Sequence, residues 1–90
     1  MKKKYVRVTY AGFFLFAEEV PHLYIEYIAK QGGYRIISAG FWNLDDEGLA
    51  VCYGESVGLR VKSRPDDTDA LREFLGQNAE AIHGEKGATK

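Results

Sequence analysis

Residues 34–44 read YRIISAGFWNL and decide the fold of this chain. The two-residue period of a strand divides the bulky apolar side chains of this segment between two faces. Ile36 and Trp42 fall on one face, and Ile37 and Phe41 fall on the other. A strand that is apolar on both faces is typical of the middle of a sheet. Gly40 interrupts the run, and it predicts a bulge or the close approach of another backbone.

Two strands are predicted upstream of this segment. Residues 4–10 alternate between apolar and polar, so Tyr5 and Arg7 share one face of a strand. A turn at residues 11–12 then returns the chain into a second strand over residues 13–17, which is apolar on both faces. A rival interpretation continues residues 13–16 into a helix, but the proline and paired glutamates that follow favour the hairpin.

A helix is predicted between the second strand and residues 34–44. It begins at Pro21, a residue that suits a first helical position, and ends before the Gly32-Gly33 pair. Spacing by three and four predicts a buried apolar stripe on this helix, made of Leu23, Tyr24, Tyr27 and Ile28. His22 lies on the opposite side and is expected to be exposed.

Two more strands and a second helix are predicted downstream. Residues 49–53 form one strand, and residues 57–63 form an amphipathic strand that points Arg60 and Lys62 outward. A helix over residues 67–75, capped by Asp66 or Asp67, follows.

Short connections favour antiparallel neighbours, so these elements predict an α+β fold of two layers. The element order is ββαβββα, with a mostly antiparallel five-stranded sheet and two helices on one face. The length predicts one domain, residues 1–76. Residues 77–90 have little to bury and predict a flexible tail.

Composition excludes several classes of protein. The formal net charge of −1 argues against nucleic-acid binding by bulk charge, and the single cysteine excludes an internal disulfide.

Ten of the 12 aromatic residues precede residue 43. Up to that point six Lys/Arg and three Asp/Glu give +3, and beyond it six Lys/Arg and ten Asp/Glu give −4. No membrane span and no export signal are recognised, so a cytoplasmic location is expected.

Catalytic and metal-binding chemistry find little support in the sequence. The sequence has one cysteine, Cys52, and two histidines, His22 and His83, of which His83 lies in the predicted tail. Nothing beyond side-chain type connects Cys52 with His22 as nucleophile and base. The acidic residues 45–47 and 66–69 lack the spacing of a calcium loop, and too few Cys and His exist for zinc. We therefore expect no enzyme, no metal and no cofactor.

Protein association is the function that the sequence favours. A two-layer domain has one dry sheet face, which leaves the apolar residues of the other face to be covered by a partner. That partner is a second copy or another protein, as for a regulator or inhibitor of the kind carried by phages and mobile elements. The predicted partner-binding residues are Tyr5, Arg7, Arg35, Phe41, Trp42 and Arg60.

Two alternatives remain open at this point. The surplus aromatic residues suit a small-molecule pocket between a helix and the sheet. An open sheet face that carries Tyr5, Arg7, Arg60 and Lys62 would instead suit single-stranded nucleic acid, by stacking bases and neutralising phosphates.

Overall fold

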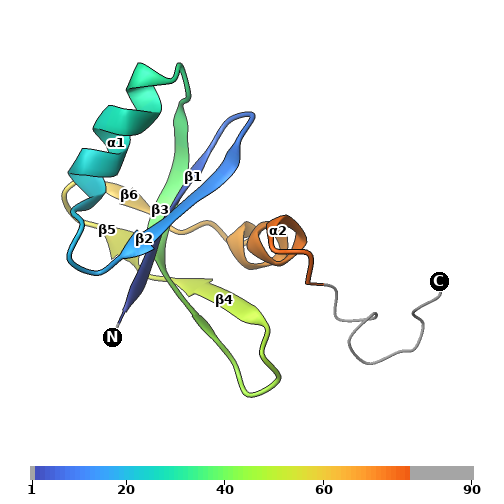
Figure 1. Cartoon of the computed structure of the whole chain (residues 1–90). Helices are drawn as coiled ribbons and strands as arrows, with labels where there is room; N and C mark the ends of the chain where they lie inside the picture. The colour runs from blue at the N-terminus through green and yellow to red at the C-terminus, as the bar shows by residue number, and fades with distance from the viewer. Residues whose placement is uncertain (1, 78–90) are drawn as a thin grey trace.

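The computed structural model describes residues 2–77 of the chain (Figure 1). Four strands form an antiparallel sheet in the order β2-β1-β3-β4, and two short strands form a separate hairpin. The elements, in chain order, are β1 (Lys3–Val8), β2 (Gly12–Ala17), α1 (His22–Gln31), β3 (Ile36–Leu44), β4 (Ala50–Tyr53), β5 (Glu55–Ser56), β6 (Val61–Lys62) and α2 (Asp67–Phe74). The predicted α+β class is confirmed, whereas the single five-stranded sheet is wrong.

β1 lies in the middle of the sheet because it pairs on both sides. Tyr5 lies opposite Leu15 of β2 and Gly40 of β3, and Val6 lies opposite Phe14 and Ala39 in the same two strands. Opposed residues in antiparallel strands share a face. Tyr5 and Val6 therefore mark the two faces of the whole sheet.

The face marked by Val6 is covered by α1. Val6 and Val8 pack against Ile25 and Ala29 of the helix, with Ala39 of β3 completing the cluster. The β5–β6 hairpin closes the same side, because Leu59 and Val61 also pack against this cluster.

The face marked by Tyr5 is covered by α2. Leu71 is fully buried there, together with Tyr5, Phe13 and Ala50. The prediction of two helices on one face is therefore wrong, since α1 and α2 lie on opposite sides of the sheet (Figure 1). Apart from Leu44 at the end of β3, which is exposed, the large apolar residues on both faces of β2 and β3 are covered or partly covered within the chain itself.

The predicted orientation of α1 is also wrong. The residues that it buries are His22, Ile25 and Ala29, not the stripe of larger apolar residues. Those larger residues, which are Leu23, Tyr24, Tyr27 and Ile28, are all exposed. A small residue such as Ala29 lets the helix approach the sheet closely, and the bulkier side chains then point outward.

The amphipathic strand predicted over residues 57–63 does not form. The chain turns at residues 57–60, between β5 and β6, and Arg60 adopts a left-handed φ of 58° within that turn. Only Val61 and Lys62 remain in a strand. Residues 57–60 form a tight hairpin turn and β6 is its return strand, in which Val61 pairs with Ser56 and Lys62 pairs with Glu55.

Gly40 is a point of close backbone approach, as predicted. A Cβ atom at this position would lie 2.5 Å from the carbonyl oxygen of Tyr53, well inside contact distance. The irregularity in the pairing of β1 with β3 falls elsewhere, between Arg7 and Val8.

The end of the described chain is tied to the sheet. Gln77, which the sequence assigns to the tail, accepts a hydrogen bond from Ala50 N at 2.8 Å and donates one to Gly48 O at 2.9 Å. The rest of the predicted tail, residues 78–90, lies outside the described residues. Within residues 2–77, neither helix has the length and apolar character needed to cross a bilayer.

Candidate functional site

The outward side of α1 is an apolar surface. Its four large residues, Leu23, Tyr24, Tyr27 and Ile28, are between 40% and 61% exposed. We call these four residues the α1 outer face. Helices that are apolar on all sides are ordinarily buried on all sides. The composition of α1 is thus that of a covered helix, although one of its sides is open.

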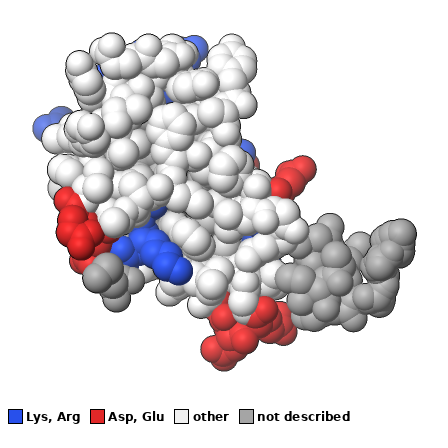
Figure 2. All heavy atoms as spheres, viewed as in Figure 1, with Lys and Arg blue, Asp and Glu red and all other residues white. Residues whose placement is uncertain are grey.

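The charges of α1 stay at the flank of this surface. The helix has two charged residues, Glu26 and Lys30, and they pair with each other at 3.2 Å across one helical turn. Figure 2 shows a broad uncharged surface in the upper part of the molecule, where α1 lies, with acidic groups gathered lower down. The α1 outer face therefore offers contact area without an unpaired charge to desolvate.

A groove borders the α1 outer face at the start of the helix. It has a volume of about 350 Å³, and it lies between α1, β3 and the turn of the β5–β6 hairpin. Leu23 and Val57 form its rim, and His22 and Phe41 line it. Val57 is 79% exposed. An apolar surface with an adjoining groove is the form that protein-binding hot spots take, because a groove admits an anchoring side chain.

His22 helps to shape this groove and is buried, contrary to the prediction. Its ring packs edge-on against Phe16 and Phe41, and its Nε2 donates to the carbonyl oxygen of Gly40 at 3.1 Å. Burial lowers the pKa of His22, the bond to Gly40 offsets part of that effect, and the nearby charge of Lys4 lowers the pKa further. His22 is thus a neutral, structural residue of the α1 side.

A buried polar cluster lies on the other side of the sheet. The Asp67 carboxylate, at the start of α2, accepts hydrogen bonds from the Tyr5 hydroxyl, Ser38 Oγ at 2.8 Å, Arg7 Nη1 at 3.0 Å and Arg64 N at 2.9 Å. Asp67, Tyr5 and Ser38 are fully buried. We call this set the Asp67 cluster. It joins α2 to the two central strands.

Electrostatics show that the Asp67 cluster holds a charge. Burial alone would raise the pKa of the Asp67 carboxyl, but its hydrogen bonds outweigh burial and hold that pKa below its usual value. Burial and the bond to Asp67 raise the pKa of Tyr5. The cluster therefore contains an ionised carboxylate and a neutral phenol at pH 7, which is the arrangement of a structural anchor.

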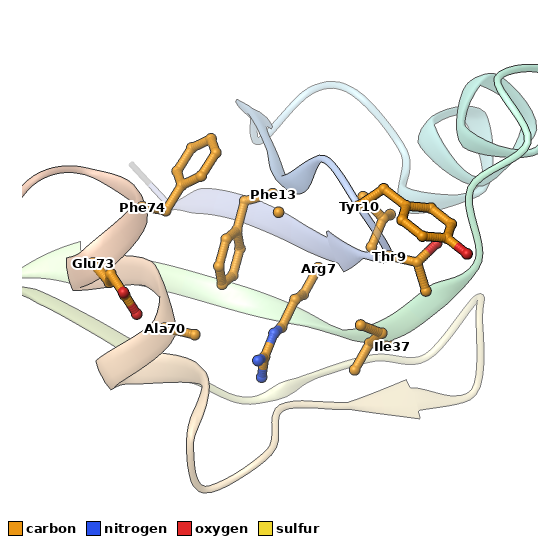
Figure 3. Close-up of a pocket in the computed structure, with 10 residues that line it drawn as sticks. Arg7, Thr9, Tyr10, Phe13, Ile37, Ala70, Glu73 and Phe74 are labelled. Carbon is orange, nitrogen blue, oxygen red and sulfur yellow. The ribbon is translucent and has the colours of Figure 1, made fainter.

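A second groove opens where α2 meets the β1–β2 turn (Figure 3). It has a volume of about 340 Å³ and is lined by apolar groups that include Phe13, Ile37 and Phe74. Arg7 enters it from β1, with its side chain 22% exposed and already paired with Asp66 and Asp67. This groove is open, and two of its polar lining residues, Arg7 and Thr9, already bond within the chain.

The six residues predicted to bind a partner are dispersed. Tyr5 and Arg7 come together in the Asp67 cluster, and Trp42 packs on that same face of the sheet. Phe41 faces the α1 side, where it lines the groove. Arg35 is exposed just before β3, next to Thr9, and Arg60 is exposed in the hairpin turn. Of the six, Phe41 is the one beside the α1 outer face, whose own residues were assigned to the core.

Within residues 2–77, the sheet has no open face of the kind assumed for nucleic-acid binding, because α1 and α2 cover its two sides. Tyr5 is fully buried beneath α2, and Arg7 is bonded to two aspartates. Arg60 belongs to the hairpin, which packs on the opposite side of the sheet. The predicted stripe of rings and basic groups is therefore not assembled on one surface.

Cys52 and His22, the candidate nucleophile and base, lie on opposite sides of the sheet. Cys52 packs with Tyr5 on the α2 side, whereas His22 lies on the α1 side. Burial, together with the negative charge of Asp67, raises the pKa of the Cys52 thiol to about 11. A thiol with that pKa is a poor nucleophile at pH 7. Among residues 2–77, no three His, Cys, Asp or Glu side chains gather closely enough to hold a metal ion.

Comparisons with known proteins give no match: no family model fits the chain, and neither the curated proteins nor the solved structures contain a significantly similar one.

Proposed function

We propose that this protein is a non-enzymatic binding module, and that another protein docks on the α1 outer face. The observation that carries this proposal is the inverted orientation of α1, which buries Ile25 and Ala29 and exposes four larger apolar side chains. The partner that fits is a protein with an apolar surface and one protruding side chain for the groove beside Leu23. We expect the encounter in the cytoplasm, where a lone thiol stays reduced.

The size of the surface supports this proposal. With large side chains of roughly 200 Å² each, the exposed fractions of the α1 outer face and Val57 give a contiguous apolar area of about 580 Å². The backbone of Gly58, next to Val57, lies against Leu23, so the hairpin turn and the helix form one surface. A specific interface uses about 800 Å² per partner, of which the apolar centre is only part.

The experiment compares two exposed tyrosines. The tagged protein is used to capture partners from an extract of its own cells, and each candidate is then purified and titrated by calorimetry. Tyr27→Ser removes the centre of the α1 outer face, and we expect it to weaken binding at least tenfold. Tyr10→Ser is the matched control, because Tyr10 is 95% exposed in the β1–β2 turn and lines the groove at α2 instead of the groove beside Leu23. The proposal fails if every captured protein binds both variants equally.

Small-molecule binding is the second candidate, and the groove beneath α2 favours it. The sequence predicts an aromatic pocket between a helix and the sheet, and Phe13 and Phe74 line such a groove with ring centroids 5.5 Å apart. A ligand that binds the native state raises the melting temperature. A panel of small uncharged aromatic compounds tests this candidate, with Phe74→Ala as the variant in which any shift is lost.

A further inference from the structure

We infer that β2 is a self-pairing edge: two copies of the chain join their β2 strands in antiparallel fashion and form one continuous sheet. The two sheets of four strands would become one of eight. This surface is separate from the α1 outer face, and the argument for it comes from the backbone.

The two edge strands of the sheet, β4 and β2, differ in whether side chains bond their outer backbone groups. At the β4 edge, side chains from the α2 region occupy the outer backbone groups: Gln77 Oε1 accepts from Ala50 N, Arg72 Nε donates to Ala50 O, and Thr68 Oγ1 accepts from Cys52 N, at 2.8 to 2.9 Å. This edge is therefore closed to another strand.

The β2 edge has no such cover within residues 2–77. β2 pairs with β1 on one side, and no hydrogen bond in the described part of the chain reaches the other side of residues 13–16. The strand has six residues, GFFLFA, without a charge or a proline. Natural edge strands are usually blunted by lysine, proline, a bulge or short length. β2 has none of these features.

The side chains of β2 are already engaged, so the backbone is what the strand offers. Phe13 is buried on the α2 side, and Phe14 packs against the cluster on the α1 side. A partner that adds a strand is recognised through main-chain hydrogen bonds, which need no free side-chain patch.

Charge favours a second copy as the occupant. A two-fold axis normal to the sheet places residues of the same face opposite each other, so Leu15 meets Leu15 of the other copy or Phe14 meets Phe14. Any charge near such an axis would face its own copy, and like charges directly opposite are destabilising. With Leu15 at the axis, the exposed Glu18 falls opposite Gly12 of the other copy instead of another carboxylate.

The first test is the mass and the hydrogen exchange of the intact protein. Sedimentation should show a species of about twice the 10.1 kDa chain mass at tens of micromolar. The amides of residues 13–16 should become at least tenfold more protected as the concentration rises through the dimerisation range. A monomer at 100 µM, or protection that does not change with concentration, overturns the inference.

The second test identifies the surface. Leu15→Cys and Phe14→Cys are made separately with Cys52→Ala, and mild oxidation should link one of them into a covalent dimer, because opposite residues approach within disulfide range. Leu44→Cys is the control, since Leu44 is exposed and lies in β3, beside β4. Equal linking of the control overturns the inference.

A third test places a charge at whichever of Leu15 and Phe14 forms the disulfide. A Lys variant alone and a Glu variant alone at that position should each dimerise at least tenfold more weakly than the unmodified chain, whereas an equimolar mixture of the two should regain the dimer. Circular dichroism confirms that each variant is folded. Two folded variants that dimerise as strongly alone as when mixed contradict pairing through β2.

Discussion

Asp67→Asn is the substitution that tests the structural reasoning most directly. The carboxylate accepts four hydrogen bonds, two at each oxygen: Ser38 and Arg7 donate to Oδ1, and Tyr5 and Arg64 donate to Oδ2. An asparagine replaces one of these oxygens by an NH₂ group, which cannot accept. In either orientation of the amide, a buried hydroxyl and a partly buried N–H group then lose the carboxylate oxygen that accepted from them.

The magnitude follows from those two donors. Each unsatisfied buried donor costs about 1–3 kcal/mol, so we expect the free energy of unfolding to fall by about 3 kcal/mol. For a domain of this size, that corresponds to a melting temperature lower by roughly 12–24 °C. Urea unfolding followed by circular dichroism measures the change.

The neighbouring aspartate provides the control. Asp66 is exposed, and within residues 2–77 its carboxylate bonds Arg7 alone, so Asp66→Asn should change the unfolding free energy by no more than about 0.5 kcal/mol. In a double-mutant cycle, Tyr5→Phe and Asp67→Asn should couple by about 1 kcal/mol or more, because the two groups share a hydrogen bond. Equal effects of the two aspartate substitutions, or additive effects in the cycle, would refute the assigned role of the Asp67 cluster.

The same carboxylate makes stability depend on pH. Its pKa is held down in the folded protein, so the folded state binds its proton less readily than the unfolded state does. The stabilisation is complete above the unfolded pKa of about 3.9, and it is lost as the pH falls through the lower, folded value. The difference between the wild type and Asp67→Asn should therefore shrink at strongly acidic pH.

Three further outcomes are expected. Burial lowers the pKa of His22 in the folded protein, so the unfolded chain takes up this proton more readily than the folded one. Stability should therefore decrease as the pH falls below about 6.5, by at most about 1.4 kcal/mol per pH unit. His22→Gln, which keeps a donor for Gly40 O, should remove this slope in thermal melts between pH 5 and 7.5. Gly40→Ala should cost about 1–3 kcal/mol in urea unfolding because its Cβ would strike the Tyr53 carbonyl, while Gly58→Ala, whose Cβ would meet Leu23 at an ordinary 3.6 Å, should be nearly neutral. Ile25→Ala should lower the unfolding free energy by about 2–5 kcal/mol, and Tyr27→Ala should lower it by no more than about 0.5 kcal/mol. The reverse ranking would mean that α1 buries the face with Tyr27, as its sequence alone suggests.

The strands and helices near residues 3–53 were predictable because their periodicity is local. The alternation in β1 and the Gly pair after α1 act over a few residues, and the structure follows them. The turn at residues 57–60 was missed because alternation over seven residues also arises by chance across a hairpin. In that hairpin, the pairing of Glu55 with Lys62 sets the chain path.

The faces of α1 and the position of α2 were not predictable from periodicity. α1 is apolar on nearly all sides, so spacing selects the larger residues, whereas close packing on the sheet selects His22, Ile25 and Ala29. The sequence did contain the signal for α2, since two strands apolar on both faces require cover on both faces. The surplus apolar residues instead predicted an interface that included Trp42, which in the structure packs within the chain on the α2 side.

The bond between Tyr5 and Asp67 cannot form until most of the chain has been synthesised. The two residues stand 62 positions apart, and at roughly 5–20 residues per second the ribosome needs about 3–12 s to make the chain between them. Throughout that interval the nascent hairpin of β1 and β2 has one face without its cover. The face of β1 that carries Tyr5 is thus covered only after α2 is made. A chain interrupted before residue 67 would expose this apolar sheet face to chaperones and proteases.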